Sequence, residues 1–287
     1  ADRGDTAWRG RGGALRRIIH LSDLHFGRDR PELMAPLLER INGLNADLVA
    51  ISGDLTQRAR NRQFQQARTF IDAIDAPTLV VPGNHDTPLY NFFERLFWPF
   101  RRYRRWINRD LQPVMHAPQA SVVGINSVNP LGIQRGWFSP RDIRRVRRGF
   151  RDAAEGALRI VVVHHPLEHL PGEDKKLMRG ARTAIKALGD AGTDIVLSGH
   201  LHSWRAETFA RIEDHRGVIQ IHAGTGLSNR VRGEPNDFNL LHLDGDRVHV
   251  ERFAAVDSTR SFDHHQKVSF CRDADGWAQC NDAAPSE

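Results

Sequence analysis

The stretch that decides the fold is residues 16–25, RRIIHLSDLH. It contains an apolar run that ends at an acidic residue. Arg16–Ser22 is typical of a buried strand, and Asp23 stands at its exit. The segments that follow alternate between helical and strand patterns: helix Pro31–Leu44, strand Asp47–Ser52, helix Asn61–Ile74 and strand Pro77–Val81. This alternation predicts βαβαβ units and a largely parallel sheet.

The same alternation resumes after residue 113 and ends near residue 199. It predicts strand Ser121–Ile125, a helix that opens at Ser139–Asp142, strand Arg159–Val163, helix Glu173–Ala191 and strand Asp194–Ser198. Ser139 suits an N-cap, and Pro140 suits the first helical position. Farther along, the pattern is typical of antiparallel strands at Arg205–Arg211, Val218–His222, Phe238–Leu243 and Arg247–Phe253.

The chain has 287 residues, enough for one large domain or two small ones. We expect a flexible N-terminal arm at 1–15 and a catalytic domain at 16–255, with an insert or cap at 87–113. Residues 256–287 are expected to form a C-terminal appendage that is weakly structured from residue 258, unless Phe262, Phe270 and Trp277 attach it to the core.

Composition and charge narrow the class of protein. The formal net charge is +6, but only four basic residues are Lys, so the Arg bias is typical of a GC-rich genome rather than of nucleic-acid binding. The chain shows no apolar run of membrane-spanning length. Its N-terminus lacks the apolar stretch of a secretion signal. Because the chain begins with Ala, a mature form whose signal has been removed is kept as an alternative. We therefore expect a cytoplasmic protein.

Two cysteines, Cys271 and Cys280, lie near the C-terminus. We expect two free thiols in a reducing cytoplasm. The alternative is a single local disulfide, which would imply an oxidising compartment.

Polar motifs follow five of the predicted strands. They are Asp23-Leu24-His25, Gly53-Asp54, Gly83-Asn84-His85-Asp86, His164-His165 and Gly199-His200-Leu201-His202. In α/β sheets, ligands gather at the carboxyl ends of the strands. Residues two apart in an extended segment point the same way, so Asp23 and His25 can bind one ion, and the two histidines after Gly199 repeat this spacing.

These motifs supply seven metal-binding side chains: Asp23, His25, Asp54, Asn84, His164, His200 and His202. Mixed oxygen and imidazole ligands favour manganese, iron, zinc or cobalt over calcium or magnesium. The carboxylate of Asp54 has two oxygens and can bridge two cations. Two metals about 3.5–4 Å apart would clamp a transferring phosphoryl group, so the motifs predict a metal-dependent phosphoester hydrolase.

With these motifs, the chain resembles the calcineurin-like metallophosphoesterase superfamily over roughly Ile18–Phe253. The stretches HLSDLH, GNHD and VVVHHP are most similar to class III cyclic-nucleotide phosphodiesterases. The resemblance implies an α/β fold, a four-layer αββα sandwich of two mixed β-sheets flanked by helices. It also implies one metal held by Asp23, His25, Asp54 and His202, and another held by Asp54, Asn84, His164 and His200. His165 is expected beside the site.

The resemblance also implies a mechanism, in which a hydroxide bridging two divalent metals attacks phosphorus in line with the leaving oxygen. His85 would lie near the leaving group as a proton or hydrogen-bond donor. Asp86 would orient His85, or alternatively only cap the next turn. We therefore take His85 and Asp86 as candidate catalytic residues.

Asn91–Arg109 interleaves aromatic residues with arginines and has three interpretations. It is a cap whose aromatics pack on the core, an interfacial element that contacts the inner membrane peripherally, or a nucleic-acid contact, which is less favoured. In each case we expect it to lie over the metals and to shape substrate choice. A homodimer is a further alternative for the state of association of the chain.

Three functions are compatible with these residues. The leading hypothesis is a phosphodiesterase acting on a cyclic nucleotide or other small phosphodiester. The second is a membrane-associated hydrolase of a lipid-linked phosphodiester or pyrophosphate, although relatives in lipid A synthesis carry Arg in place of His85. The third is a DNA-processing nuclease.

Overall fold

The computed structural model describes residues 15–132, 134–168, 177–209, 217–231 and 233–280. Two sheets form its centre. The larger has the order β13-β12-β11-β10-β1-β2-β3, with β1 (Arg17–Leu21), β2 (Leu48–Ile51), β3 (Thr78–Val80), β10 (Asp237–Asp244), β11 (Arg247–Val256), β12 (Ser261–Asp273) and β13 (Gly276–Cys280). The smaller has the order β4-β5-β6-β7-β9-β8, with β4 (Val114–His116), β5 (Ala120–Ile125), β6 (Leu158–Val163), β7 (Ile195–Ser198), β8 (Arg205–Thr208) and β9 (Ile219–His222).

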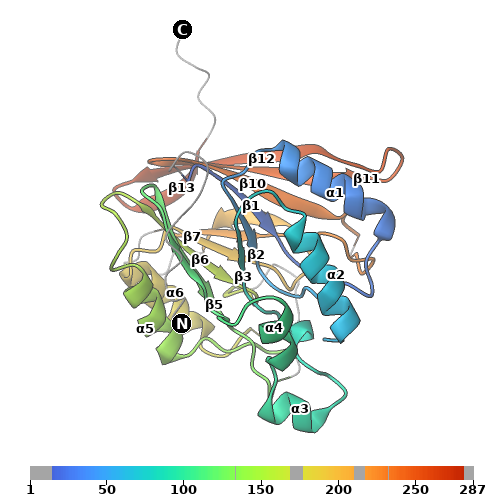
Figure 1. Cartoon of the computed structure of the whole chain (residues 1–287). Helices are drawn as coiled ribbons and strands as arrows, with labels where there is room; N and C mark the ends of the chain where they lie inside the picture. Colours follow the sequence, from blue (N-terminus) through green and yellow to red (C-terminus); the bar gives the residue numbers. More distant parts are fainter. Residues whose placement is uncertain (1–14, 133, 169–176, 210–216, 232, 281–287) are drawn as a thin grey trace.

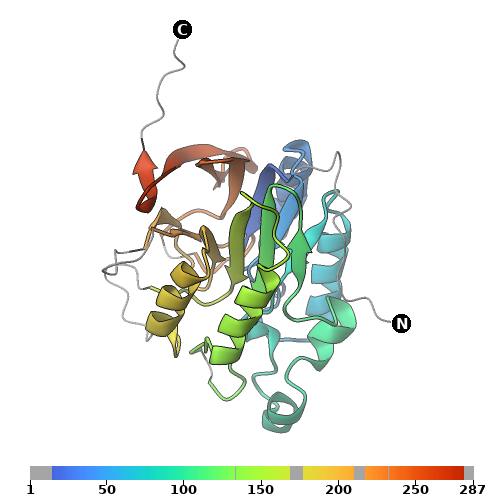
Figure 2. The same ribbon diagram turned by 90° about the vertical axis from the view of Figure 1, so that its left-hand side faces the viewer.

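Helices cover the outer faces of both sheets (Figures 1 and 2). The larger sheet carries α1 (Pro31–Gly43), α2 (Asn61–Asp72) and α4 (Arg101–Trp106), and the smaller carries α5 (Pro140–Gly149) and α6 (Ala181–Asp190). A further short helix, α3 (Phe92–Phe97), lies at the lower end of the molecule in Figure 1. The arrangement is the predicted four-layer αββα sandwich.

Alternate residues of the central strands supply different parts of the core. In β1, Ile18 belongs to the cluster between the two sheets, whereas Ile19 packs with the cluster beneath α1 and α2. In β6, Val162 lies between the sheets and Val163 beneath α5 and α6. Burial on both faces explains why these strands are continuous apolar runs rather than alternating ones.

Parallel pairing brings the polar motifs to one edge. β1 runs parallel to β2 and β2 to β3, while β5, β6 and β7 are also parallel neighbours. The carboxyl ends of these strands therefore carry their loops to the same end of the sandwich, where the metal-binding motifs begin. Strand β9 differs from the prediction, because it pairs parallel with β7 and antiparallel only with β8.

The C-terminal segment corrects two expectations. Residues 261–273 and 276–280 form β12 and β13, which extend the larger sheet, so a weakly structured tail from residue 258 is wrong over these strands. Phe262, Phe270 and Trp277 are buried there, which gives the strands their apolar contacts. A disulfide joins Cys271 to Cys280, so the expectation of free thiols is also wrong. Such a bond is typical of an oxidising compartment.

Other expectations meet the structure with smaller differences. Ser139 caps α5, with Pro140 at the first helical position, as predicted. The helix predicted at Glu173–Ala191 begins only at Ala181 in the described part, and residues 169–176 lie outside it, as does most of the predicted arm at 1–15. The proposed domain boundaries stay predictions. Among the described residues, every helix falls short of the length or apolarity that crossing a bilayer requires.

Candidate metal centre

Loops at the carboxyl ends of five strands bring the seven predicted ligands together. Asp23 and His25 follow β1, and Asp54 follows β2; Asn84 lies in a short 3-10 helix, η1 (Asn84–Asp86), after β3; His164 follows β6; His200 and His202 follow β7. The two sheets thus contribute to one site, since β1 to β3 belong to the larger sheet and β6 and β7 to the smaller.

Asp23, His25 and His202 form a first cluster. Oδ1 of Asp23 lies 3.3 Å from Nε2 of His25 and 3.2 Å from Nε2 of His202. The two Nε2 atoms are themselves 3.2 Å apart. Ligands bound about 2.1 Å from one ion lie roughly 3.0–3.4 Å from each other, so these three atoms fit a shared cation.

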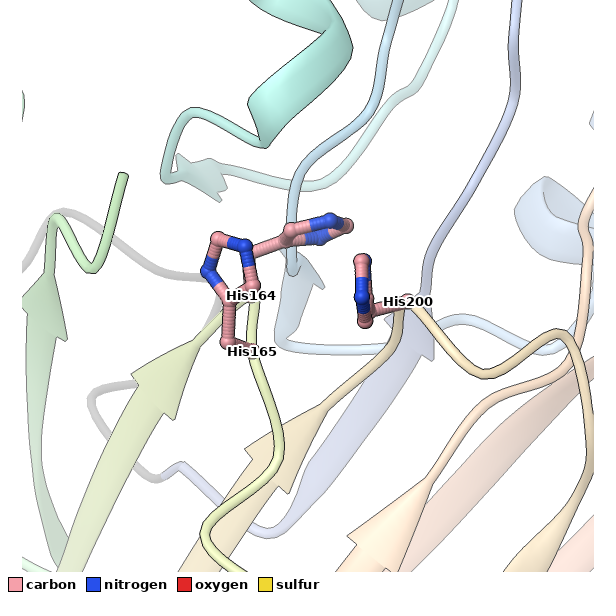
Figure 3. A group of neighbouring side chains, drawn as sticks. All are labelled: His164, His165 and His200. Atoms are coloured by element: carbon pink, nitrogen blue, oxygen red, sulfur yellow. The ribbon is translucent and has the colours of Figure 1, made fainter. Parts of the chain in front are cut away.

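His164 contacts two further predicted ligands, Asn84 and His200, which we group with it as the second cluster. Nε2 of His164 lies 3.2 Å from Oδ1 of Asn84, and the rings of His164 and His200 have centroids 5.2 Å apart. Figure 3 shows these two rings, with His165, gathered at the ends of β6 and β7. The donor set is again mixed oxygen and imidazole nitrogen.

Asp54 lies between the two clusters. Its Oδ2 is 3.7 Å from Nε2 of His25 and 3.4 Å from Nε2 of His164. Its Oδ1 accepts a hydrogen bond of 2.8 Å from the backbone N–H of His85, which holds the carboxylate in this orientation. One carboxylate therefore faces both groups of imidazoles.

The backbone at these ligands is left-handed rather than extended. Asp23, His25, Asp54, His200 and His202 have φ values of 53°, 48°, 52°, 72° and 60°. The expectation of an extended Asp-x-His segment is therefore wrong, although its two side chains do converge. Left-handed backbone at a non-glycine residue costs roughly 1–2 kcal/mol, and such residues cluster at functional sites.

The electrostatics of the site favour positive charge. Burial alone would raise the pKa of the Asp54 carboxyl, but the imidazoles of His164, His85 and His25 outweigh it and lower this pKa. Burial would lower the pKa of His164, but Asp54 and Asp23 raise it to about 9. Within the described part of the chain, Oδ1 of Asp23 is buried without a hydrogen-bond partner. The carboxylates that stabilise the extra proton on His164 would stabilise a metal cation in the same way.

Hydrogen bonds on the far side of two rings set their tautomers. Nδ1 of His164 lies 2.8 Å from the carbonyl oxygen of Ser52, and Nδ1 of His202 lies 3.0 Å from that of Arg230. A carbonyl only accepts, so Nδ1 carries a hydrogen, and in the neutral ring that binds a metal the lone pair of Nε2 points into the site. The residues present therefore fit a pair of metal ions.

The structure places His85 beside the first cluster, with its ring centroid 4.9 Å from that of His25. Its Nδ1 is 2.9 Å from the carbonyl oxygen of Gln57, and Nε2 is 3.4 Å from Nη1 of Arg230. Gln57 and Arg230 are contacts that the sequence analysis missed. Gln57 follows Asp54 closely, but nothing near Arg230 resembles a motif.

Asp86, the last residue of η1, lies against the loop after β2. Its carboxylate accepts hydrogen bonds from the backbone N–H groups of Leu55, Thr56 and Gly83 and from the hydroxyl of Thr56. These bonds tie η1 to the loop after β2. The ring of His85 contacts the carbonyl of Gln57 rather than Asp86, and Asp86 caps η1 through the N–H of Gly83. A catalytic role for Asp86 stays a prediction.

His165 lies beside the site, next to His164 and His200. Its ring centroid is 4.7 Å from that of His200, while Nδ1 is 2.8 Å from the hydroxyl of Ser127. Burial and the neighbouring His164 lower its pKa to about 3, which keeps the ring neutral. His164, His165 and His200 can each present one nitrogen to a common point. The choice of His164 as the ligand stays a prediction.

A cavity of about 180 Å³ adjoins the site, lined by Gln57, Arg58, Asn84, His85, Thr87, Leu89, Gln134 and Arg230. Of the insert at 87–113, only its first residues border this cavity. Helix α4 packs instead on α2, where Tyr103 is buried and donates a hydrogen bond to the carbonyl of Val80. The start of the insert thus lies beside the site, whereas α4 packs on α2; the expected role of the insert in substrate choice stays a prediction.

A family model described as calcineurin-like phosphoesterase matches residues 16–204. The chain is 26% identical over 163 residues to a glycerophosphodiester phosphodiesterase, GpdQ, of Enterobacter lignolyticus, covering 52% of this chain and 57% of that protein. It is 21% identical over 279 residues to a probable cyclic nucleotide phosphodiesterase of Rhodopseudomonas palustris, covering 89% and 98%. The chain thus spans only 57% of the first relative's length.

Solved structures share the fold. A purple acid phosphatase of yellow lupin superposes with a TM-score of 0.69 at 12% identity, covering 99% of this chain and 59% of that one. GAP50 of the Plasmodium inner membrane complex superposes with a TM-score of 0.54 at 13% identity, covering 83% and 84%.

Proposed function

We propose that this chain, which belongs to the calcineurin-like phosphoesterase family, is a phosphodiesterase that uses two divalent metal ions. The family and the phosphodiesterase names of its relatives support this proposal. The observation that carries it is the position of Oδ2 of Asp54, between Nε2 of His25 and Nε2 of His164.

In this proposal, Asp23, His25 and His202 would hold one ion, and Asn84, His164 and His200 would hold the other. Asp54 would contribute to both sites. Manganese, iron, zinc and cobalt suit these ligands. When bound, such ions polarise phosphoryl oxygens and offset the charge that develops on them.

His85 is proposed to supply a hydrogen bond or proton to the leaving oxygen. Its Nδ1 is held by the carbonyl of Gln57, so Nε2 is the atom that meets substrate. Burial lowers the pKa of the free ring. A phosphodiester anion beside Nε2 would raise this pKa again, so substrate binding itself favours the protonated donor.

The substrate is proposed to be a cyclic nucleotide or other small phosphodiester. The adjoining cavity of about 180 Å³ admits one small group. Arg58 and Arg230 line it and give it a positive potential that attracts an anion. A glycerophosphodiester is the other small candidate, because relatives carry that name.

A lipid-linked phosphodiester or pyrophosphate is the second candidate. One observation favours it: Leu89 lines the cavity, and the adjacent Tyr90 is exposed and begins an apolar surface on α3. A DNA-processing nuclease has no comparable observation in its favour. A cytoplasmic site of action stays a prediction, and the disulfide favours an oxidising compartment instead.

The test is hydrolysis of bis(p-nitrophenyl) phosphate by the full chain reconstituted with manganese. We expect metal-dependent turnover that exceeds turnover of p-nitrophenyl phosphate and that Asp54→Asn abolishes. Asp72→Asn, which changes an exposed carboxylate paired with Arg68, is the matched control and should retain activity. A panel of cyclic nucleotides, glycerophosphodiesters, lipid diphosphates and DNA then ranks the substrates. Failure to hydrolyse any phosphodiester would refute the proposal.

A further inference from the structure

Helix α3 is amphipathic, but its apolar face is exposed and its charged side is buried, the opposite of a helix that packs on a core. Phe92, Phe93, Leu96 and Phe97 share one helical face by their spacing, and that face is exposed: Phe92 is 66% exposed, Phe93 71% and Phe97 61%. On the opposite side, Arg95 is only 7% exposed. The helix therefore buries its charge and presents its aromatic rings.

The buried side of α3 is anchored by polar contacts. The guanidinium of Arg95 donates to the carbonyl oxygens of Pro88, Pro130 and Gly132 at 3.2, 2.6 and 3.0 Å. Glu94 forms an ion pair of 2.8 Å with Arg102. These contacts hold both polar residues inward. They therefore fix the orientation of the helix, with its apolar face outward.

The exposed face continues beyond the helix. Tyr90 and Trp98 flank α3 and are 75% and 61% exposed, and Leu131 is 74% exposed. Leu131 lies between the two carbonyls, of Pro130 and Gly132, that Arg95 holds. We call the set the α3 surface: Tyr90, Phe92, Phe93, Leu96, Phe97, Trp98 and Leu131. Exposed apolar surface of this extent marks an interaction site, and α3 forms the lower tip of the molecule in both views (Figures 1 and 2).

Positive charge borders the α3 surface. Arg101, Arg104 and Arg105 follow it directly and are exposed. Glu94 is the one acidic residue between positions 90 and 109, and Arg102 already pairs with it. The tip therefore combines an uncharged aromatic face with a cationic rim.

We propose that the α3 surface docks on an anionic lipid bilayer. Aromatic and aliphatic side chains would enter the headgroup region, and the arginines of the rim would pair with lipid phosphates. This combination of apolar insertion and positive charge is what a peripheral protein needs to bind anionic lipid. The proposal concerns binding only and does not depend on the proposed catalysis.

Two other occupants fit the tip less well. A second copy docked about a two-fold axis would bring Arg101, Arg104 and Arg105 of both chains to one interface, where like charges repel. A single-stranded nucleic acid needs stacking rings interleaved with its phosphate contacts. Here the exposed rings lie on or beside α3 and the exposed arginines on α4, and Leu96 and Leu131 offer no ring to stack on.

Docking would also place the cavity close to the bilayer. Leu89 lines the cavity together with Asn84 and His85, and Tyr90 is the next residue. The metal centre would thereby face the level of the headgroups.

The test is co-sedimentation of the full chain with vesicles. We expect binding to phosphatidylcholine vesicles that contain phosphatidylglycerol, and much weaker binding to phosphatidylcholine alone. The variant Phe92→Ser/Phe93→Ser/Phe97→Ser should reduce the partition coefficient at least about tenfold, because three rings no longer leave water. Arg104→Gln/Arg105→Gln, which removes one positive charge at each position, should reduce binding to the anionic vesicles by about fivefold for each residue.

The control is Met34→Ser, which removes an exposed apolar side chain on α1 at the far end of the molecule (Figure 1) and should bind as the parent does. Unchanged thermal unfolding shows that the variants fold. The proposal is overturned if the parent chain stays in the supernatant, or if the triple variant binds vesicles as well as the parent. It is equally overturned if the triple variant instead loses self-association or oligonucleotide binding.

Discussion

Nε2 of His25 and Nε2 of His202 face each other 3.2 Å apart, although 177 positions separate the two residues in the chain. His25 follows β1 of the larger sheet and His202 follows β7 of the smaller one. Either a shared hydrogen or a cation must separate these two nitrogens, because two lone pairs directed at each other would repel. A metal ion bound at this point would link the two sheets as well as serve the site.

Removal of metal should consequently lower stability. A ligand bound only by the folded state, at about 1,000 times its Kd, adds about 4 kcal/mol. For a chain of this size we expect the unfolding temperature to fall by on the order of 5–10 °C when manganese is replaced by a chelator. Scanning calorimetry measures the shift, and His202→Ala should lose most of it. Equal midpoints with and without metal would contradict this link.

Replacing His85 with Ala should lower kcat by about 10²–10⁴-fold, the usual contribution of a positioned acid. The ring is not assigned to either metal, so metal content should stay near that of the parent chain. Turnover and bound metal, measured on the same sample, separate the two effects. Loss of both metals in this variant would refute the role given to His85.

Asp86→Asn should act differently, through structure. The carboxylate accepts from three backbone N–H groups and one hydroxyl, and an amide would turn an NH₂ group toward some of these donors. We expect the free energy of unfolding to fall by about 1–3 kcal/mol together with turnover. Urea unfolding of this variant beside His85→Ala checks the contrast. A stability equal to that of His85→Ala would argue against the loop-holding role.

Buried His222 should make the fold sensitive to acid. Burial and the nearby Arg205 lower its pKa to about 3, whereas the unfolded value is about 6.5. The unfolded chain therefore binds an extra proton between about pH 3 and pH 6.5. Above that window, the contribution of His222 to the free energy of unfolding is fully present. As the pH falls through the window, this contribution decreases by on the order of 1 kcal/mol per pH unit.

His222→Asn tests this reasoning because the amide can still pair with the hydroxyl of Ser198, which lies 2.8 Å from Nδ1 of the ring. Stability measured by urea unfolding across the window should fall less steeply in the variant. A residual slope is expected, since burial together with His222 also lowers the pKa of His20 to about 3. Parallel slopes in the two proteins would count against His222 as a titrating group.

The sequence predicted the α/β core and the convergence of the site because both depend on local patterns. Apolar runs marked the central strands, and polar residues at their ends identified the loops that meet. The backbone conformation that brings these side chains together was not predictable in this way. Left-handed backbone at Asp23 and His25 leaves no signature in side-chain type. The contact between Arg230 and His85 depends on tertiary packing across 145 positions.

Polar composition misled the prediction at the C-terminus. Residues 263–267 read DHHQK and are exposed, which conceals the strand that contains them. Pairing with β11 forms β12, and buried residues at both its ends attach it to the core. Conversely, the aromatics of the insert suggested core packing, which holds for Tyr103 on α4, but not for Phe93 on α3.

The central claim is that Asp54 bridges two ions, and anomalous scattering from crystals of manganese-loaded protein tests it most directly. We predict two peaks about 3.5–4 Å apart on either side of the Asp54 carboxylate, as in other two-metal sites. One lies among Asp23, His25 and His202, and the other among Asn84, His164 and His200. A single peak, or two peaks that do not share Asp54, would contradict the account.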